Sequence, residues 1–302
     1  MIPPTPALSV VVVSLGDAAA LARTIAAVAA ACEGVDTELV LALPRRLHGL
    51  APAGPPHLPV RVIESPGAGD DPWERRALAV RHARAPLVAT LEDHALPTPG
   101  YGAQVLAAHA SNPRAAIGGV VTKSATDGAT GWAMYFLDYG RYIPPRTAGP
   151  TRWLSACNVT YKRAALDRVA ESWSRHMHET TVHLALLAAG EELWLDPGLV
   201  VDQRRQQSFA EARAELRRHG AAFGRDLAEH VGLAARALRI VSAPLIPLVQ
   251  VARAGSHLRR APRLIPAFVR SAPVLVVLAM AWAGGELRGL LGGRRHGLHA
   301  HP

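Results

Sequence analysis

Three consecutive side chains that can bind a metal ion or a phosphate follow a short hydrophobic segment. Residues 87–91 read Leu-Val-Ala-Thr-Leu, and Glu92-Asp93-His94 comes directly after them. Carboxylate oxygens suit Mg²⁺ or Mn²⁺, and imidazole is an acceptable ligand of Mn²⁺. Asp93 and His94 are therefore candidate ligands of a divalent cation. An ordinary polar turn after a strand, with Asp93 as a cap, explains the same triplet, so both interpretations stay open.

A second acidic candidate lies at the start of a predicted helix over residues 179–190, in the run His178-Glu179-Thr180. A carboxylate at this position could act as a general base that removes a proton from a hydroxyl group. An acidic residue in the first turn of a helix is also favoured by the helix dipole, without any chemistry. The position alone does not separate the two.

The elements that must position these residues alternate along the first half of the chain. Strands are predicted at 8–13, 38–43, 60–63 and 87–91, and helices at 17–32, with Asp17 as N-cap, and at 72–84. This alternation predicts a doubly wound α/β sheet, whose ligands bind at the carboxyl ends of the strands. Ser14 and Glu92-Asp93-His94 are then expected at one edge. For residues 117–160 we expect strands and a long loop, with an aromatic cluster that serves packing.

The order of these motifs resembles that of the family 2 glycosyltransferases. Arg76, sixteen residues before Glu92, stands where that family has a helix arginine, and Glu92-Asp93-His94 falls on its Asp-x-Asp triplet. The resemblance covers roughly residues 8–205. It also includes the turn Pro99-Gly100-Tyr101, the segment 154–163 with Asn158, and His178-Glu179-Thr180.

The resemblance implies a GT-A-type fold and the transfer of a sugar, with inversion, from a nucleotide-diphosphate sugar to an acceptor hydroxyl. Glu179 would be the catalytic base, and Asp93 and His94 would hold Mg²⁺ or Mn²⁺, which neutralises the leaving phosphate. Guanidinium groups suit phosphate oxygens, so Arg225 is a further candidate. The expected nucleotide-sugar contacts are Ser14, Arg76, Glu92, Asp93, Asn158 and Arg225.

The chain departs from the family pattern at three places. His94 replaces the usual second Asp, residues 41–44 carry no acidic residue, and Asp202-Gln203 stands where a His often follows a strand. The altered triplet keeps an alternative open, a catalytically weak membrane-bound protein that binds nucleotide sugars or acts as a scaffold. A nucleotidyltransferase is less well supported, because no glycine-rich, lysine-containing loop follows the first strand.

The last third of the chain carries the basic surplus. Residues 1–200 have a net charge of −1 and residues 201–302 a net charge of +10. Two apolar segments, 237–252 and 264–292, flank a basic stretch from Arg253 to Arg263. This pattern predicts an anionic membrane surface as partner. Nucleic acid is not expected, because the region lacks interleaved aromatics and any DNA-binding motif.

We therefore expect a GT-A catalytic domain over 1–205, an amphipathic helical connector over 206–236 and a membrane-associated region over 237–302. Spanning helices would export the basic stretch, against the positive-inside tendency, so helices lying in the membrane plane fit better. An ordinary buried helical pair is the alternative. With only Cys32 and Cys157, the chain fits a reducing compartment, so the cytoplasmic face of the membrane is the expected location. The acceptor would be a glycan or a lipid-linked glycan.

Overall fold

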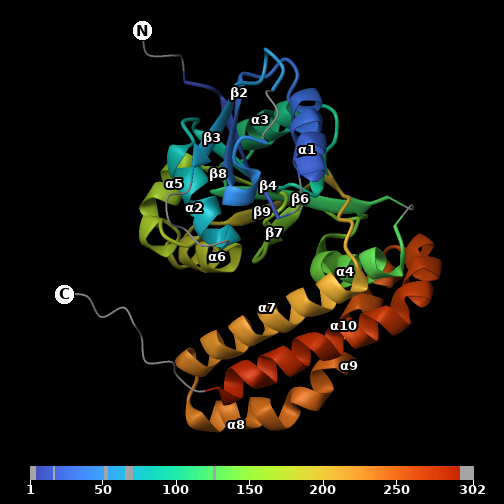
Figure 1. Cartoon of the computed structure of the whole chain (residues 1–302). Helices are drawn as coiled ribbons and strands as arrows, with labels where there is room; N and C mark the ends of the chain where they lie inside the picture. Colours follow the sequence, from blue (N-terminus) through green and yellow to red (C-terminus); the bar gives the residue numbers. More distant parts are fainter. Residues whose placement is uncertain (1–4, 16–17, 51–53, 65–70, 125–126, 293–302) are drawn as a thin grey trace. The chain divides into compact units, whose positions relative to one another are not determined.

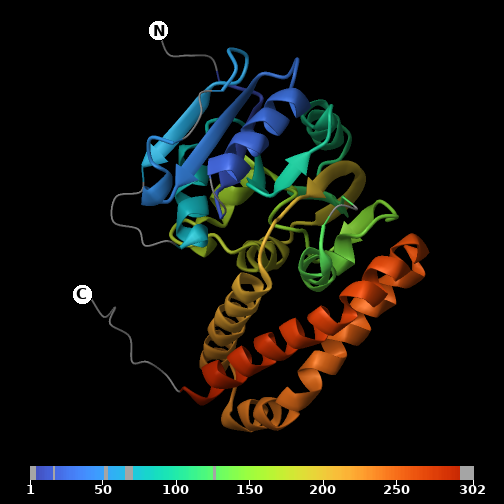
Figure 2. The same cartoon turned by 45° about the vertical axis from the view of Figure 1, so that its right-hand side comes forward.

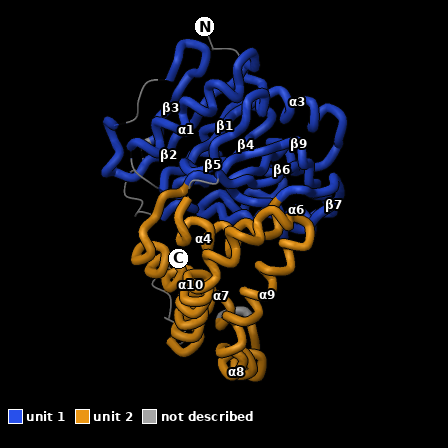
Figure 3. The backbone as a smooth tube through the Cα atoms, turned by 90° about the vertical axis from the view of Figure 1, so that its right-hand side faces the viewer, with its two compact units in different colours: residues 1–124, 144–204 blue, residues 125–143, 205–302 orange. Residues whose placement is uncertain are grey.

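The computed structural model describes residues 5–15, 18–50, 54–64, 71–124 and 127–292. The chain forms two compact units (Figure 3). One comprises residues 1–124 and 144–204, and the other comprises residues 125–143 and 205–302. Each unit has its own packing and is described separately.

The first unit is built on one mixed sheet. In the described residues the sheet has nine strands in the order β3-β2-β1-β4-β8-β6-β9-β5, with β7 paired to β9. β1 to β4 are mutually parallel, and β8 runs antiparallel between β4 and β6. The strands are β1 Leu8–Val13, β2 Thr37–Leu43, β3 Val60–Glu64, β4 Leu87–Glu92, β5 Ala95–Pro97, β6 Ala116–Lys123, β7 Gly149–Thr151, β8 Val159–Lys162 and β9 Leu193–Gln203.

Helices cover both faces of this sheet (Figure 1). The first strand connection moves from β1 to β2 and the connection through α2 moves back from β3 to β4, so right-handed crossovers place α1 and α2 on opposite faces. The predicted doubly wound α/β sheet is confirmed, and the antiparallel pairs of β8 make it a mixed sheet. The helices of this unit are α1 Ala18–Ala31, α2 Pro72–His82, α3 Tyr101–Ser111, α5 Arg163–Arg168 and α6 Glu179–Ala188.

Local sequence signals explain where these elements begin and end. Every residue of β1 and β2 is buried, as expected for parallel strands covered on both faces. The Asp71 side chain accepts a hydrogen bond from the Trp73 amide and caps α2, whose first residue is Pro72. Gly190, just beyond α6, has a φ of 80°, a conformation that glycine adopts without steric cost. The predicted cap Asp17 lies outside the described residues.

The second unit is helical (Figure 2). It contains α4 Ala129–Tyr139, α7 Phe209–His230, α8 Leu233–Ser242, α9 Ile246–Ser256 and α10 Ile265–Leu291. α10 packs along α7 and against α4, where the rings of Phe136 and Phe268 meet edge to face at a centroid distance of 5.2 Å. By length and composition alone, Leu233–Arg259 and Pro262–Leu291 could each cross a membrane.

Between residues 117 and 160 the expected strands are present as β6, β7 and the start of β8, but part of the expected loop is the helix α4. Its aromatic residues Trp132, Tyr135, Phe136 and Tyr139 recur at positions i, i+3, i+4 and i+7, which places them on one face of a helix. All four are buried. The cluster serves packing, as expected, but it does so on a helix.

Two glycine pairs allow α7 and α10 to approach each other at backbone distance. A Cβ atom at Gly220 or Gly224 would collide with carbonyl oxygens of α10, and one at Gly285 or Gly289 would collide with carbonyl oxygens of α7. Only glycine, which lacks this atom, permits such spacing. The two helices are therefore joined along residues 217–225 and 282–289.

Candidate active site

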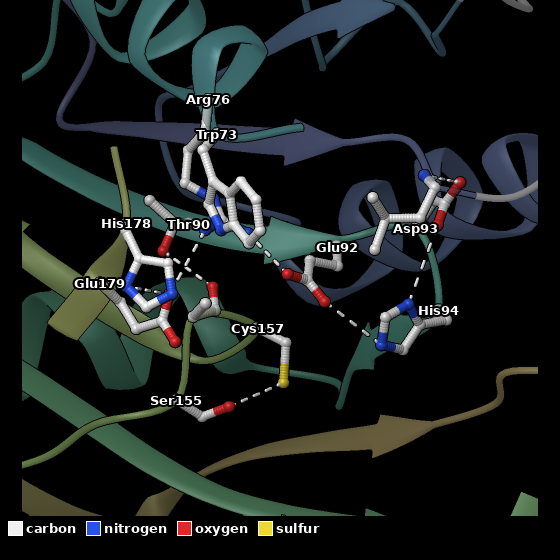
Figure 4. A network of polar contacts seen from close by, with 12 residues as sticks. Trp73, Arg76, Thr90, Glu92, Asp93, His94, Ser155, Cys157, His178 and Glu179 are labelled. Carbon is white, nitrogen blue, oxygen red and sulfur yellow. Dashed lines mark hydrogen bonds and ion pairs between the residues drawn. The ribbon is translucent and has the colours of Figure 1, made fainter. Parts of the chain in front are cut away.

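The candidate site lies where the carboxyl ends of β1 and β4 meet α2 and the first turn of α6 (Figure 4). Glu92 ends β4, Arg76 lies in the second turn of α2, and Glu179 is the first residue of α6. The carboxyl ends of neighbouring parallel strands lie at one edge of the sheet, so Ser14 after β1 is close to Asp93 after β4. Segments more than a hundred residues apart thus share one site.

Arg76 joins the two carboxylates that sequence analysis assigned to different roles. Its Nη2 atom is 2.6 Å from Oε1 of Glu92, and its Nη1 atom is 3.7 Å from Oε2 of Glu179. The arginine side chain is 3 % exposed, whereas those of Glu92 and Glu179 are 14 % and 27 % exposed. A buried guanidinium needs compensation by nearby carboxylates, and here it shares two. The structure therefore brings Arg76, Glu92 and Glu179 together.

Asp93 is directed away from this group, toward the segment that follows β1. Its Oδ2 atom accepts hydrogen bonds from the Ser14 hydroxyl at 2.7 Å and from the Leu15 amide at 2.9 Å. Its own carbonyl oxygen accepts a bond from the Thr24 hydroxyl at 2.7 Å. With only 2 % of its surface exposed, Asp93 fastens the segment after β1 and helix α1 to the end of β4.

His94 faces Glu92 more closely than it faces Asp93. Its Nε2 atom is 3.3 Å from Oε2 of Glu92, and its Nδ1 atom is 3.9 Å from Oδ1 of Asp93. Two adjacent ligands in an octahedral shell of about 2.1 Å radius lie about 3 Å apart. The pair of Glu92 and His94 therefore fits two neighbouring positions around Mg²⁺ or Mn²⁺.

The pair would not hold a cation alone. Across the described residues, no three His, Cys, Asp or Glu side chains form a group that could hold a metal ion. A cation bound by one or two protein side chains takes its remaining oxygens from water and from substrate phosphates. This donor set suits a cation that arrives with a diphosphate.

Glu179 has an environment that keeps its carboxylate ionised. Burial raises the pKa of Glu179, but the positive potential of His178 and of Arg76 outweighs burial, so that the net pKa lies below its ordinary value. One turn further along α6, burial lowers the pKa of His183 to about 4, so that His183 is neutral at pH 7. Its Nε2 atom lies 3.0 Å from the Tyr161 hydroxyl. The result is a carboxylate able to accept a proton.

Two of the predicted contact residues are not part of this group. Asn158 is fully buried: its Nδ2 atom donates to the carbonyl oxygens of Val120 and Leu199, both at 2.9 Å, and its Oδ1 atom accepts from the Tyr101 hydroxyl. It holds β6, β8 and β9 together. Arg225 is exposed on α7, in the second unit, and its contact with the nucleotide sugar stays a prediction.

Sequence analysis missed two neighbours of Arg76. Arg75 is 3 % exposed, and its Nη2 atom donates to the Ser14 carbonyl oxygen at 2.9 Å. Trp73 lies one turn before Arg76, with its ring centroid 5.2 Å from that of His176 and 5.4 Å from that of His178. The consecutive arginines at the start of a predicted helix were the available signal, but the family resemblance drew attention to only one of them.

The chain is similar to a mannosyltransferase of Pyrobaculum calidifontis, PcManGT, solved with GDP-Man and Mn²⁺: identity is 12 %, the TM-score is 0.55, and 97 % of this chain and 89 % of the other are covered. It is also similar to residues 1–349 of S. aureus TarS, solved with UDP-GlcNAc, at 11 % identity, a TM-score of 0.51 and 92 % coverage of both chains.

The fold is the GT-A glycosyltransferase fold. At such low identity the likeness concerns the fold, and membership of family 2 stays a prediction. No protein-family model matches the sequence, and no curated protein matches it either. The roles of individual side chains in this chain therefore rest on their own contacts.

Proposed function

We propose that this protein is an inverting glycosyltransferase that moves a sugar from a nucleotide-diphosphate sugar to an acceptor hydroxyl. The observation that carries the proposal is the shared guanidinium of Arg76, which holds Glu92 and Glu179 within one ion-pair group. The Glu92 carboxylate lies at the end of β4, where ligands of doubly wound sheets bind, and the Glu179 carboxylate lies on the other side of the Arg76 guanidinium. The nucleotide sugars in the two similar structures are consistent with such a donor.

Glu179 would act as the base. Its lowered pKa keeps the carboxylate ionised at neutral pH, so it can take the proton of the acceptor hydroxyl while that oxygen attacks the anomeric carbon. The bond from the anomeric carbon to the diphosphate oxygen breaks, and the diphosphate leaves with the electron pair. A single displacement of this kind inverts the anomeric configuration.

The leaving diphosphate needs positive charge. Glu92 and His94 would hold a divalent cation, which neutralises phosphate charge when bound. The sequence prediction paired His94 with Asp93, but the contacts of Asp93 with Ser14 and Leu15 favour Glu92 as the partner. Arg76, whose side chain is 3 % exposed, would keep the Glu92 carboxylate oriented.

The proposed acceptor is a glycan or a lipid-linked glycan at the cytoplasmic face of a membrane. The apolar and basic character of the second unit supports a membrane-bound acceptor. The alternative, a protein that binds nucleotide sugars without turnover, makes a different prediction in the test below.

The test uses Glu179→Gln, with the exposed Glu171→Gln of the same unit as the matched control. Release of nucleoside diphosphate is measured from a panel of GDP- and UDP-sugars with Mn²⁺ and a lipid-linked acceptor fraction, and donor binding is measured by calorimetry. Removing a general base costs about 10²- to 10⁴-fold in turnover. Glu179→Gln should lose this factor with donor binding retained, and the control should not. Equal turnover of both variants refutes the base, and donor binding without turnover in the unmodified protein supports the alternative.

A further inference from the structure

Helix α8 turns its polar face inward and its apolar face outward. The half-buried Arg239 forms an ion pair with the fully buried Glu286 of α10, with Nε and Oε1 2.5 Å apart, and Arg236 donates to the Leu290 carbonyl oxygen. On the other side of α8, Leu233, Leu238 and Val241 are 83 %, 71 % and 77 % exposed. A surface helix in water has the opposite arrangement, with its apolar stripe toward the core.

The neighbouring helices α9 and α10 carry further exposed apolar residues. α9 and α10 contact each other, and α8 lies against the last turns of α10 (Figures 1 and 2). We call the exposed apolar residues of this region the apolar hairpin face. Its members are Leu233, Leu238, Val241, Leu245, Leu248, Val249, Ile265, Val269, Val276, Val277, Met280 and Leu291. So much exposed aliphatic surface in one region of a chain marks an interaction site.

The charges around this face select its partner. Residues 231–292 contain eight arginines, no lysine and one acidic residue, Glu286, which is buried and paired with Arg239. The exposed charges are thus cations, among them Arg253, Arg260 and Arg270. Two copies of the face would bring like charges together, which disfavours self-association. A bilayer that contains anionic lipids satisfies both the apolar residues and the arginines.

The packing of α10 decides how these helices meet the bilayer. The second half of α10 lies at backbone distance from α7 along the glycine pairs, and α7 exposes Arg213, Arg217 and Arg218 in this region. A spanning α10 would carry these arginines and Glu286 into hydrocarbon, which is costly. The segment Leu233–Arg259 is long enough to span a bilayer, but α8 at its start is tied to α10 through Arg236 and Arg239.

We propose that the apolar hairpin face docks this protein onto an anionic bilayer, with α8, α9 and α10 lying in the plane of the membrane interface. The Arg239–Glu286 ion pair and the bond from Arg236 hold α8 in the orientation that presents its leucines to lipid. Apolar side chains enter the boundary between headgroups and acyl chains, and the arginines contact lipid phosphates. This docking is independent of the transfer reaction proposed above.

Vesicle co-sedimentation of the full chain tests the proposal. The vesicles are phosphatidylcholine alone or phosphatidylcholine with phosphatidylglycerol, at low and high salt. The test variant is Leu233→Ser/Leu238→Ser/Val241→Ser, and the control is Leu50→Ser/Val62→Ser/Leu184→Ser, which removes exposed apolar residues from the first unit. We expect binding to anionic vesicles that weakens with salt, a loss of at least tenfold in the test variant, and none in the control.

Labelling separates in-plane from spanning helices. Arg260→Cys introduces a thiol between α9 and α10, and both native cysteines are buried. With protein added to preformed vesicles, an impermeant thiol reagent should label this position without detergent. Protection until detergent is added would show spanning helices and overturn the proposal. It would also be overturned by full-length protein that stays in the supernatant, by equal binding of the test variant and the control, or by a dimer that the test variant dissociates.

Discussion

Replacing Asp93 with alanine removes the acceptor of two buried hydrogen bonds at the end of β4. The donors are the Ser14 hydroxyl and the Leu15 amide, at 2.7 and 2.9 Å from the same carboxylate oxygen. The Ser14 hydroxyl would lose this partner at a place that water does not reach, because Ser14 is fully buried, whereas Leu15 is half-buried. Asp93→Ala should therefore destabilise the fold of the first unit, whatever its effect on a metal ion.

The magnitude follows from the two bonds. Hydrogen bonds to a charged group contribute about 1.5–3 kcal/mol, and a buried donor left without a partner costs about 1–3 kcal/mol. Asp93→Ala should lower the free energy of unfolding by about 2–5 kcal/mol. Ser14→Ala removes one donor and leaves Asp93 bonded to Leu15, so it should cost about 1–2 kcal/mol. The two changes share one bond, and their coupling energy should be about 1 kcal/mol or more.

Urea unfolding of the four proteins in this double-mutant cycle, followed by circular dichroism without added metal, gives these quantities. His94→Ala is a useful comparison, because it removes a candidate metal ligand without removing the acceptor for Ser14. If Asp93→Ala unfolds within 0.5 kcal/mol of the unmodified protein, or if the cycle shows no coupling, the assignment of Asp93 as a fastening residue is wrong.

Three further predictions concern charge and packing. Arg76 lowers the pKa of Glu179, so Arg76→Gln should raise the pKa of Glu179. The acid limb of the kcat/KM profile should then move to higher pH, and a limb at the same pH would show that Arg76 does not control the ionisation of Glu179. Burial lowers the pKa of His109 to about 4, so below pH 6.5 the unfolded state binds more protons than the folded state. As the pH falls from 7 to 5, this one group should therefore lower the free energy of unfolding by about 2 kcal/mol. His109→Gln should remove that part of the pH dependence in urea titrations, and an unchanged difference would contradict it. In Gly284→Ala the new methyl group meets open space on α10, so this change should stabilise the protein by about 0.5–1 kcal/mol. In Gly285→Ala the methyl group collides with the backbone of α7, so this change should destabilise the protein by about 1–3 kcal/mol. If the melting temperatures of both variants shift in the same direction, this packing is wrong.

The sheet could be predicted because its signals are local. β1 is a run of apolar and β-branched residues, and Pro72 together with Asp71 marks the start of α2. The strand-end rule also placed Ser14 near Asp93, which their hydrogen bond confirms. These inferences need only composition, periodicity and the topology that alternating elements impose.

The rest depended on contacts between distant segments. The approach of Glu179 to Arg76 is set by where α6 packs, and nothing in its neighbouring residues encodes this distance. Asn158 matched a family motif, yet its amide is used by two backbone carbonyls. For α8, the sequence shows an amphipathic pattern, but it takes the contacts of Arg236 and Arg239 with α10 to reveal which side faces inward.

The close seam between α7 and α10 has a practical meaning for anyone who shortens this chain. Ending it before Pro262 would strip α7 of the backbone that covers Gly220 and Gly224, and would leave the ring of Phe136 without that of Phe268. Insolubility of such a fragment would then be caused by exposure of the protein interior and would say nothing about a lipid anchor. Substitutions on the outer surface of α8 leave that interior packed and therefore test membrane binding more directly.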